Sequence, residues 1–564
     1  MQRHLFALCG IALSLGLFAT ACGSGGDSPT STSTSTGTGT GTGGAGGAGG
    51  TGGAGGAGST TSTSSGTSAD SPLVTTDKGP VQGKILGNTR AFLGLPYAAP
   101  PTGALRWKPP QPHVAWNTAL VLDAVGPACP QFDSNTGKLV AGTSEDCLTL
   151  NIWTPNADLK KAVPVLVWVH GGSFVTGSGG DALYDGQALS EATGSVVVTI
   201  NYRLGPLGFL ASSALSAEDP AHPASGMYGF EDQRAALAWV KANIGLFNGD
   251  AKNVTLFGES AGGISTCLHL ISPPSEGLFQ RAIIESGPCS TATGTTKANA
   301  EAQGAALATA LGCKDAATAL TCLRGKTTEE VMLALKSASG VLSGDGVSWF
   351  PSVDGVDVPD QPQKLLDVGK FAKVPTLIGT NKNEGTIFVS GLSVTTPADY
   401  AAVLESIFPG RGAKVATQYP LAMYASAKAA VAEVFGDSSF VCPTRKTARA
   451  LAKSGVATYV YHFTHALVTP FGPELGVFHG SEIPFIFGNP FFTLTLTAEE
   501  KPLSNTMIGY WSRMAAGGDP NGMGALAWPK YDVANEQNIV LDLTPSTQKD
   551  LKKSVCDFWD SLTP

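Results

Sequence analysis

The hydrophobic positions after residue 70 form short apolar runs separated by glycine-rich turns and helical stretches. Val163–Val169 is apolar throughout, and Ser195–Ile200 repeats the pattern. Continuous apolar runs of this length are typical of parallel strands buried on both faces. A third run, Val254–Phe257, leads directly into a glycine-rich turn and a helix that we expect to end near Leu270. The pattern predicts an α/β fold with a large, mostly parallel central sheet flanked by helices.

The first 22 residues have a different pattern. Arg3 precedes an apolar run of about fifteen residues, which is too short for a stable membrane span, so we expect 1–22 to be a secretion signal. The run ends in Ala19-Thr20-Ala21-Cys22, which resembles the lipobox of bacterial lipoproteins. We therefore expect lipidation of Cys22 and attachment to the outer membrane or cell surface by acyl chains. Cleavage near Ala21 by a general signal peptidase, which would give a secreted protein, is the alternative.

Residues 23–70 are almost entirely Gly, Ser, Thr and Ala. Such a segment has no apolar surface to bury and cannot offset the entropy of ordering, so it predicts a flexible linker. Residues 71–564 contain no further segment of this kind, and we expect them to form one domain. The net charge of −8 and the absence of Lys/Arg clusters argue against nucleic acid as a partner and favour small or neutral molecules. The sequence leaves the oligomeric state open.

Cysteine usage is consistent with export. Two of the ten cysteines lie within 1–22, and the other eight show no metal-ligand spacing such as CxxC. An even number in an oxidising compartment predicts disulfides. Their spacing favours three pairs: Cys129/Cys147, Cys313/Cys322 and the long-range Cys442/Cys556. Two cysteines remain, Cys267 and Cys289, which either pair or stay as buried thiols.

The turn after the third apolar run carries the first candidate for chemistry. Gly258-Glu-Ser-Ala-Gly-Gly263 contains G-x-S-x-G between a strand and a helix, which is the setting of a nucleophile elbow. We therefore predict Ser260 as a nucleophile. Gly258 and Gly262 allow the strand and the helix to pass close to each other. Glu259 either shapes the electric field in the pocket or serves the structure, and we do not count it as catalytic.

Acyl transfer at a serine also requires donors for the oxyanion. The backbone N–H of Ala261 begins the helix and is the first candidate. Gly172 and Ser173 belong to the glycine-rich loop His170–Phe174, which follows the first apolar run and lies beside the elbow in this fold. These three N–H groups are the predicted oxyanion hole.

A serine hydroxyl needs a histidine to take its proton, and on this fold the histidine comes last in the chain. Of the histidines after Ser260, His269 falls within the elbow helix. His462 lies inside a strand pattern and His465 just beyond it. His479 lies in a loop with glycines on both sides, where a catalytic base can be presented. The residues alone favour His479 without excluding His465.

The histidine in turn needs a carboxylate. Glu384 comes shortly after the apparent strand 373–379, at the end of the sheet where catalytic groups of α/β proteins collect. The alternative role of Glu384 is to favour the start of a following helix through its dipole. Asp354 and Asp367 are the other candidates for the acid.

Several separated motifs together resemble the type-B carboxylesterases, the group that includes the cholinesterases. The resemblance covers nearly all of the chain from about Pro72. The motifs are Phe92–Ala98, Pro100–Trp107, Ser144–Ile152, the loop from His170, Asn201–Gly205, Phe257–Gly263, Asn383–Gly385 and His479–Ile483. The chain departs from the commonest family pattern at Met227, Phe230 and Ser173, none of which is a triad position.

This resemblance implies a Ser260–Glu384–His479 triad, an oxyanion hole of Gly172, Ser173 and Ala261, and the three disulfide pairs given above. It implies two-step hydrolysis of a carboxylic ester, with a small-molecule ester as the partner and with no metal or organic cofactor. The alternative is a non-catalytic, cell-surface binding module on the same fold. Selectivity of a lipase or cholinesterase kind depends on loops that the sequence does not place, including those near Phe132, Trp349 and Phe350.

Overall fold

The computed structural model describes residues 72–562, except for 134–135, 158–160, 290–294, 316, 336–345, 469–473 and 492. The predicted signal at 1–22, the predicted linker at 23–70 and the lipidation site Cys22 lie outside these residues and stay predictions. None of the helices in the described ranges is long and apolar enough to cross a membrane.

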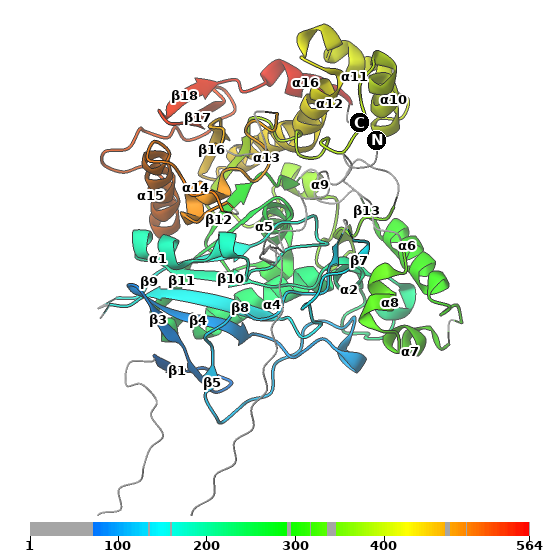
Figure 1. Ribbon diagram of the computed structural model, residues 1–564, viewed down its shortest axis with the longest axis vertical. Helices are drawn as coiled ribbons and strands as arrows, with labels where there is room; N and C mark the ends of the chain where they lie inside the picture. Colours follow the sequence, from blue (N-terminus) through cyan, green and yellow to red (C-terminus); the bar gives the residue numbers. More distant parts are fainter. Residues whose placement is uncertain are drawn as a thin grey trace, which may run out of the picture. The chain divides into compact units, whose positions relative to one another are not determined.

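An eleven-stranded sheet forms the centre of the fold, in the order β18-β17-β16-β15-β12-β11-β9-β10-β8-β4-β3 (Figure 1). The strands from β17 to β10 in this order are parallel, and those at both edges pair antiparallel. The predicted α/β fold with a mostly parallel sheet is therefore confirmed. The strands are β3 (Lys84–Leu86), β4 (Thr89–Pro96), β8 (Thr149–Pro155), β9 (Val163–Val169), β10 (Val196–Ile200), β11 (Gly249–Glu259), β12 (Arg281–Glu285), β15 (Thr376–Asn381), β16 (Thr458–Phe463), β17 (Gln537–Leu541) and β18 (Ser546–Lys549).

Smaller sheets complete the strand inventory of the described residues. They consist of β1 (Leu73–Thr75), β2 (Pro80–Gln82) and β5 (Leu120–Val121), of β6 (Phe132–Asp133) with β7 (Lys138–Leu139), and of β13 (Thr295–Thr296) with β14 (Ser352–Val353). Among the predicted strands of the central sheet, β9 has the expected bounds and β10 is one residue shorter. The strand of the third run extends further at its N-terminal end than its apolar core predicts, because β11 begins at Gly249.

Helices cover both faces of the sheet, so alternate residues of one strand enter two different cores. Val165 and Val167 of β9 pack in the core that includes α4 (Tyr228–Asn243) and α5 (Ala261–Ile271). Leu166 and Trp168 pack in the core with α14 (Ile483–Phe487) and α15 (Lys501–Gly517). This double burial explains why β9 is apolar at every position.

A third core gathers helices at one end of the fold, where α10, α11, α12 and α16 lie together (Figure 1). These are α10 (Pro397–Ile407), α11 (Gly412–Gln418), α12 (Ala427–Gly436) and α16 (Lys553–Leu562). The remaining helices are α1 (Gln187–Thr193), α2 (Gly205–Phe209), α3 (Ser213–Ser216), α6 (Lys297–Ala310), α7 (Ala319–Arg324), α8 (Thr328–Leu333), α9 (Pro362–Asp367) and α13 (Cys442–Lys453).

Four disulfides join the eight cysteines of the described residues. The three predicted pairs, Cys129–Cys147, Cys313–Cys322 and Cys442–Cys556, are present. Cys267 of α5 pairs with Cys289, with their Cα atoms 5.2 Å apart. This fourth bond answers the question that the sequence left open, and it links the helix after Ser260 to the segment after β12.

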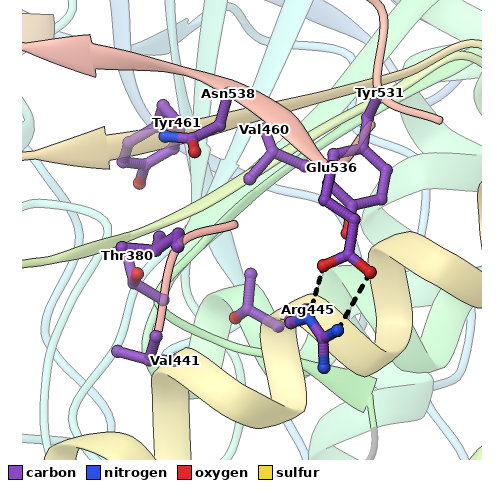
Figure 2. Close-up of a pocket in the computed structure, with 10 residues that line it drawn as sticks. Thr380, Val441, Arg445, Val460, Tyr461, Tyr531, Glu536 and Asn538 are labelled. Atoms are coloured by element: carbon purple, nitrogen blue, oxygen red, sulfur yellow. Dashed lines mark hydrogen bonds and ion pairs between the residues drawn. The ribbon is translucent and has the colours of Figure 1, made fainter. Parts of the chain in front are cut away.

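A buried ion pair fixes the segment that leads into β17. Arg445 of α13 donates to both carboxylate oxygens of Glu536, at 2.6 and 2.9 Å, and the two side chains face each other in Figure 2. Arg449 contacts the same carboxylate. A cavity of about 20 Å³, room for roughly one water, lies beside the pair and is lined by residues that include Tyr531. The side chains of Arg445 and Glu536 are 8% and 4% exposed, so the carboxylate depends on these cations for its burial.

Replacing Arg445 with alanine is expected to lower the free energy of unfolding by about 3 kcal/mol, because Glu536 stays buried with only part of its charge compensated. Urea unfolding of the oxidised protein measures the change. Lys364→Ala is the matched control, since Lys364 is 67% exposed and its ion pair with Asp360 contributes at most about 0.5 kcal/mol. Equal losses in the two variants would contradict a special role for the buried pair.

Candidate active site

Ser260 lies on a sharp turn between β11 and α5. Its φ and ψ are 56° and −121°, an uncommon conformation for a residue with a side chain. The N–H of Ser260 donates to the carbonyl of Glu285 in the neighbouring strand β12, at 2.9 Å. The turn is thus held by the sheet itself, which is the local structure predicted for a nucleophile elbow.

Small residues bring the glycine-rich loop against this turn. A Cβ added at Gly262 would collide with the carbonyl of Val169 at the end of β9. A Cβ at Gly171 would lie only 3.1 Å from the Cβ of Ser260. The loop after β9 and the turn after β11 therefore touch, as the order of strands in the sheet requires.

Three backbone N–H groups lie free around this contact. Gly172 and Ser173 both have positive φ, of 103° and 53°, and the carbonyl of Gly172 accepts the N–H groups of Val175 and Thr176 at 3.0 Å each. Within the described residues, the N–H groups of Gly172, Ser173 and Ala261 donate no hydrogen bond to another protein group. The hydrogen bonds that close the loop use the carbonyl of Gly172, so these three N–H groups stay available to a ligand.

Glu384 and His479 form a direct hydrogen bond. Nδ1 of His479 is 2.6 Å from Oε2 of Glu384. The other oxygen, Oε1, accepts from Ser286 Oγ at 2.6 Å and from the N–H of Asn381 at 2.7 Å. Glu384 is 1% exposed, so these donors compensate a carboxylate that water does not reach.

The other histidine candidates have different surroundings. His462 lies in β16 with its side chain buried, and burial, followed by the nearby lysines, lowers its pKa to about 3. His465 lies beyond that strand, where Nε2 is 3.1 Å from a carboxylate oxygen of Glu500. His269 of α5 contacts Ser275 through Nδ1, at 2.8 Å. None of these three contacts the acid Glu384 in the described residues.

The alternative acids are also occupied elsewhere. Asp354 accepts the N–H groups of Val356 and Val358 and closes its own loop, at 3.1 and 2.8 Å. Asp367 ends α9 and accepts from Gln363 on the same helix. Among the three carboxylates considered from the sequence, only Glu384 contacts a histidine in the described residues.

A second carboxylate faces the opposite nitrogen of His479. Oε1 of Glu259 lies 3.1 Å from Nε2, so the imidazole bridges two acids. Burial alone would lower the pKa of His479, but Glu259 and Glu384 raise it to about 9. Burial raises the pKa of Glu259 to about 7, against the opposing effect of His479. No hydrogen bond joins Ser260 Oγ to His479 Nε2 in the described part of the chain.

Sequence reasoning missed three further polar groups. Glu482 is fully buried and accepts from Asn381, and burial together with Glu259 and Glu384 raises its pKa to about 8. Glu285 is equally buried, and one oxygen accepts from the indole N–H of Trp511 at 2.8 Å. Ser286 holds Glu384, as described above. Ser286 directly follows β12, so its position after a parallel strand was a signal that could have revealed it.

Aromatic side chains enclose the His479 ring. The ring centroids of Phe388 and Phe440 lie 5.0 and 4.6 Å from that of the imidazole. A cavity of about 1240 Å³, lined by Glu384, Phe478, Phe491 and neighbouring residues, lies on the other side of the acid.

The aromatic residues that the sequence associated with selectivity have different surroundings. Trp349 is buried in the core, and Phe350 packs edge-on against Phe174 of the glycine-rich loop, with ring centroids 5.4 Å apart. Phe132 belongs to the two-residue strand β6. Of the three, Phe350 thus packs against the loop that carries the predicted oxyanion donors.

Comparison with known proteins agrees with this geometry. Residues 70–559 match the carboxylesterase family over most of the chain. The chain belongs to the carboxylesterase family. It is 35% identical over 533 residues to an acetylcholinesterase of Bungarus fasciatus, which covers 87% of this chain and 86% of that protein. The solved structure of a PNB esterase, 33% identical, covers 86% of this chain and 99% of its own with a TM-score of 0.75.

This membership identifies the protein as a serine hydrolase of carboxylic esters, as the sequence predicted. The fold agrees as well, because the related structure has the same α/β architecture.

Glu259→Gln is expected to lower the pKa of His479 from about 9 towards its ordinary value of 6.5. Removing the negative charge beside Nε2 makes the imidazolium less favourable, so its proton leaves at lower pH. By linkage, the raised pKa of His479 contributes stability that is present in full below pH 6.5 and is lost as the pH rises through 9. NMR titration of labelled histidine measures the shift.

Glu276→Gln serves as the control, because Glu276 is exposed after α5. Its substitution should leave the His479 titration unchanged. A His479 pKa that is the same in Glu259→Gln and wild type would contradict an electrostatic role for Glu259.

Proposed function

We propose that the protein hydrolyses carboxylic esters through a triad of Ser260, His479 and Glu384. The observation that carries this proposal is the 2.6 Å hydrogen bond between His479 and the buried Glu384, in a loop next to the turn of Ser260. A carboxylate bound to Nδ1 fixes the imidazole tautomer and stabilises its protonated form. Nε2 of His479 can then accept the serine proton once its contact with Glu259 is broken.

The reaction proceeds in two steps. Ser260 Oγ attacks the ester carbonyl while His479 takes the hydroxyl proton, and the same proton passes to the leaving alcohol. Water then attacks the acyl-serine while His479 accepts a proton from it, the bond between the acyl carbon and Ser260 Oγ breaks, His479 returns the proton to Oγ, and the carboxylic acid leaves. No step requires a metal or an organic cofactor.

The backbone N–H groups of Gly172, Ser173 and Ala261 stabilise the negative charge that develops on the ester oxygen. This role is supported by two observations: the three N–H groups lie around the turn of Ser260, and they donate to no other protein group within the described residues. Donors of this kind act on the transition state, and losing one typically costs about 3 kcal/mol of barrier. Backbone donors also explain why a serine is acceptable at position 173.

Glu259 affects when His479 can act as a base. In the absence of substrate Nε2 faces Glu259, and the raised pKa of His479 keeps a proton on the ring near neutral pH. Ester binding must therefore compete with this ion pair before Ser260 is activated. Hydrogen bonds of catalytic groups often tighten only once substrate is present.

The substrate we propose is a small, neutral ester with a short or medium acyl chain. The net charge of −8 and the lack of a basic cluster support a neutral partner. The related proteins act on esters by name, as acetylcholinesterase and PNB esterase. The binding-module alternative is disfavoured, because every group that the ester reaction needs has a candidate beside Ser260.

Ser260→Ala and His479→Ala are each expected to reduce kcat/KM for p-nitrophenyl butyrate by about 10⁴-fold or more, because each removes a group on which the whole triad depends. Glu384→Gln should also lower the rate, since it loses the charge that stabilises the imidazolium. Initial rates with acetate, butyrate and longer esters measure the loss and the acyl preference.

Matched controls are Ser213→Ala, at an exposed position in α3, and His465→Gln. Both should retain wild-type rates. An inactive wild-type protein with intact circular dichroism would favour the binding module, and an active His479→Ala variant would remove His479 from the mechanism.

Four disulfides suggest an exported protein. We further propose that Cys22 is lipidated and that residues 23–70 tether the enzyme to the cell envelope. The support is the lipobox-like sequence at Ala19–Cys22 and the segment that follows it. That segment is almost entirely Gly, Ser, Thr and Ala, and it is long enough to hold a domain away from a membrane.

Cys22→Ser is expected to move the enzyme from the membrane fraction to the soluble fraction, because acyl chains would no longer be attached. Fractionation of a bacterial host that processes lipoproteins, with incorporation of labelled fatty acid, checks this. Cys9→Ser, within the apolar run, is the control and should leave the distribution unchanged. Wild-type protein found free of lipid would instead support cleavage near Ala21.

A further inference from the structure

Three metal-ligating side chains from distant parts of the sequence meet away from Ser260. His222 lies in the loop between α3 and α4, Glu231 lies in the first turn of α4, and Asp357 follows β14. One ligand atom from each lies within 4.8 Å of the other two. His222 Nε2 and Glu231 Oε1 are already 2.7 Å apart.

Glu231 and Asp357 are both buried, and each has a carboxylate oxygen that accepts no hydrogen bond among the described residues. Glu231 is 1% exposed and Asp357 is fully buried. Arg234, one turn further along α4, contacts Oδ1 of Asp357. Among the described residues, Glu231 Oε2 and Asp357 Oδ2 accept no hydrogen bond, although water does not reach them. Buried carboxylate oxygens are normally hydrogen-bonded or bound to a cation, so these two require an explanation.

We propose that His222, Glu231 and Asp357 bind a divalent transition-metal ion, of which zinc is the best match. The chemistry of the donors selects this class, because imidazole nitrogen together with carboxylate oxygen suits zinc, whereas calcium and magnesium prefer oxygen alone. The sequence did not reveal the site, since its ligands follow no short motif.

The protein geometry is close to what such an ion needs. Tetrahedral zinc with bonds of about 2 Å brings ligand atoms to roughly 3.3 Å from one another. The largest separation between the ligand atoms, up to 4.8 Å, must close by about 1.5 Å, and movement of the surface loop of His222 can contribute to this. The His222 side chain is 19% exposed although its Nε2 is buried, so a water for the fourth position would enter from the side of this loop.

Arg234 completes the surroundings of the ion. Its guanidinium binds one oxygen of Asp357 and leaves the other directed to the metal, as outer groups do around many metal ligands. Two carboxylates, one guanidinium and a divalent ion leave a local charge of one positive unit, which the open side of the site shares with water. Glu231 and Asp357 would then each be buried next to a cation that compensates the negative charge.

Metal binding competes with a proton on His222. When zinc binds Nε2, a proton held on that nitrogen passes to the solvent, so zinc affinity should fall when the pH is lowered.

The site would stabilise the fold and would not enter the chemistry at Ser260. It links the loop before α4 to α4 and to the segment after β14. Gln233 of α4 contacts Ser265 and His269 of α5, at 3.1 and 3.2 Å, so α4 supports the helix that follows Ser260. This inference is independent of the proposed triad.

The test uses the full chain with a histidine-free affinity tag, dialysed against EDTA. Calorimetric titration with zinc chloride at pH 7 should show one ion bound per chain. The unfolding temperature should rise with zinc. Calcium or magnesium at the same concentration should not raise it.

Two variants locate the ion. His222→Gln should weaken zinc binding by at least about 100-fold while keeping the loop polar, and His113→Gln, a histidine outside the cluster, should bind as wild type. His479→Gln should also retain zinc, which distinguishes this site from the imidazole beside Ser260. Absence of zinc binding by the wild type, equal binding by His222→Gln, or loss of binding in His479→Gln would each overturn the proposal.

Discussion

The sharp turn at Ser260 constrains everything around it. A side chain with positive φ between a strand and a helix is unfavourable unless the neighbours enforce it. β11 lies between β9 and β12, so the turn is held from both sides: Gly171 packs on it from the end of β9, and the carbonyl of Glu285 receives its N–H from β12. Glu384 follows β15 and His479 follows β16, so the sheet order brings the remaining groups to the same edge.

Crowding three carboxylates, Glu259, Glu384 and Glu482, around one imidazole has a clear electrostatic outcome. Glu259 and Glu482 are buried and have raised pKa values, with burial as the leading cause. The acids thereby hold protons more readily, whereas the imidazole becomes more basic. Protons in such a group are shared, and its titration belongs to the cluster more than to any one side chain.

Sequence reasoning succeeded where the information is local. The apolar run at Val163–Val169 gave a buried strand because both faces of that strand are covered by helices. The turn around Ser260 was recognisable because its motif, strand and helix are contiguous. His479 could be preferred to His465 by its glycine-rich setting and by the resemblance to the carboxylesterases, but its contact with Glu384, 95 residues away, needed coordinates.

The features that sequence reasoning missed depend on packing between distant segments. The Cys267–Cys289 bond requires knowing how α5 lies against the segment after β12. The sequence did not indicate the role of Glu285, because a single acid at the end of an apolar strand is equally compatible with a side chain exposed to solvent. The meeting of Glu231 with Asp357 likewise arises only when α4 packs beside the segment after β14.

The Cys442–Cys556 disulfide closes a span of 114 residues and joins α13 to α16, next to the Arg445 ion pair with Glu536. That span includes β16, the His479 loop and β17. The bond cannot form until the whole span has been synthesised and has reached an oxidising compartment. Once closed, this covalent loop limits how far α13 and α16 can separate, and with them the two ends of the segment that carries His479.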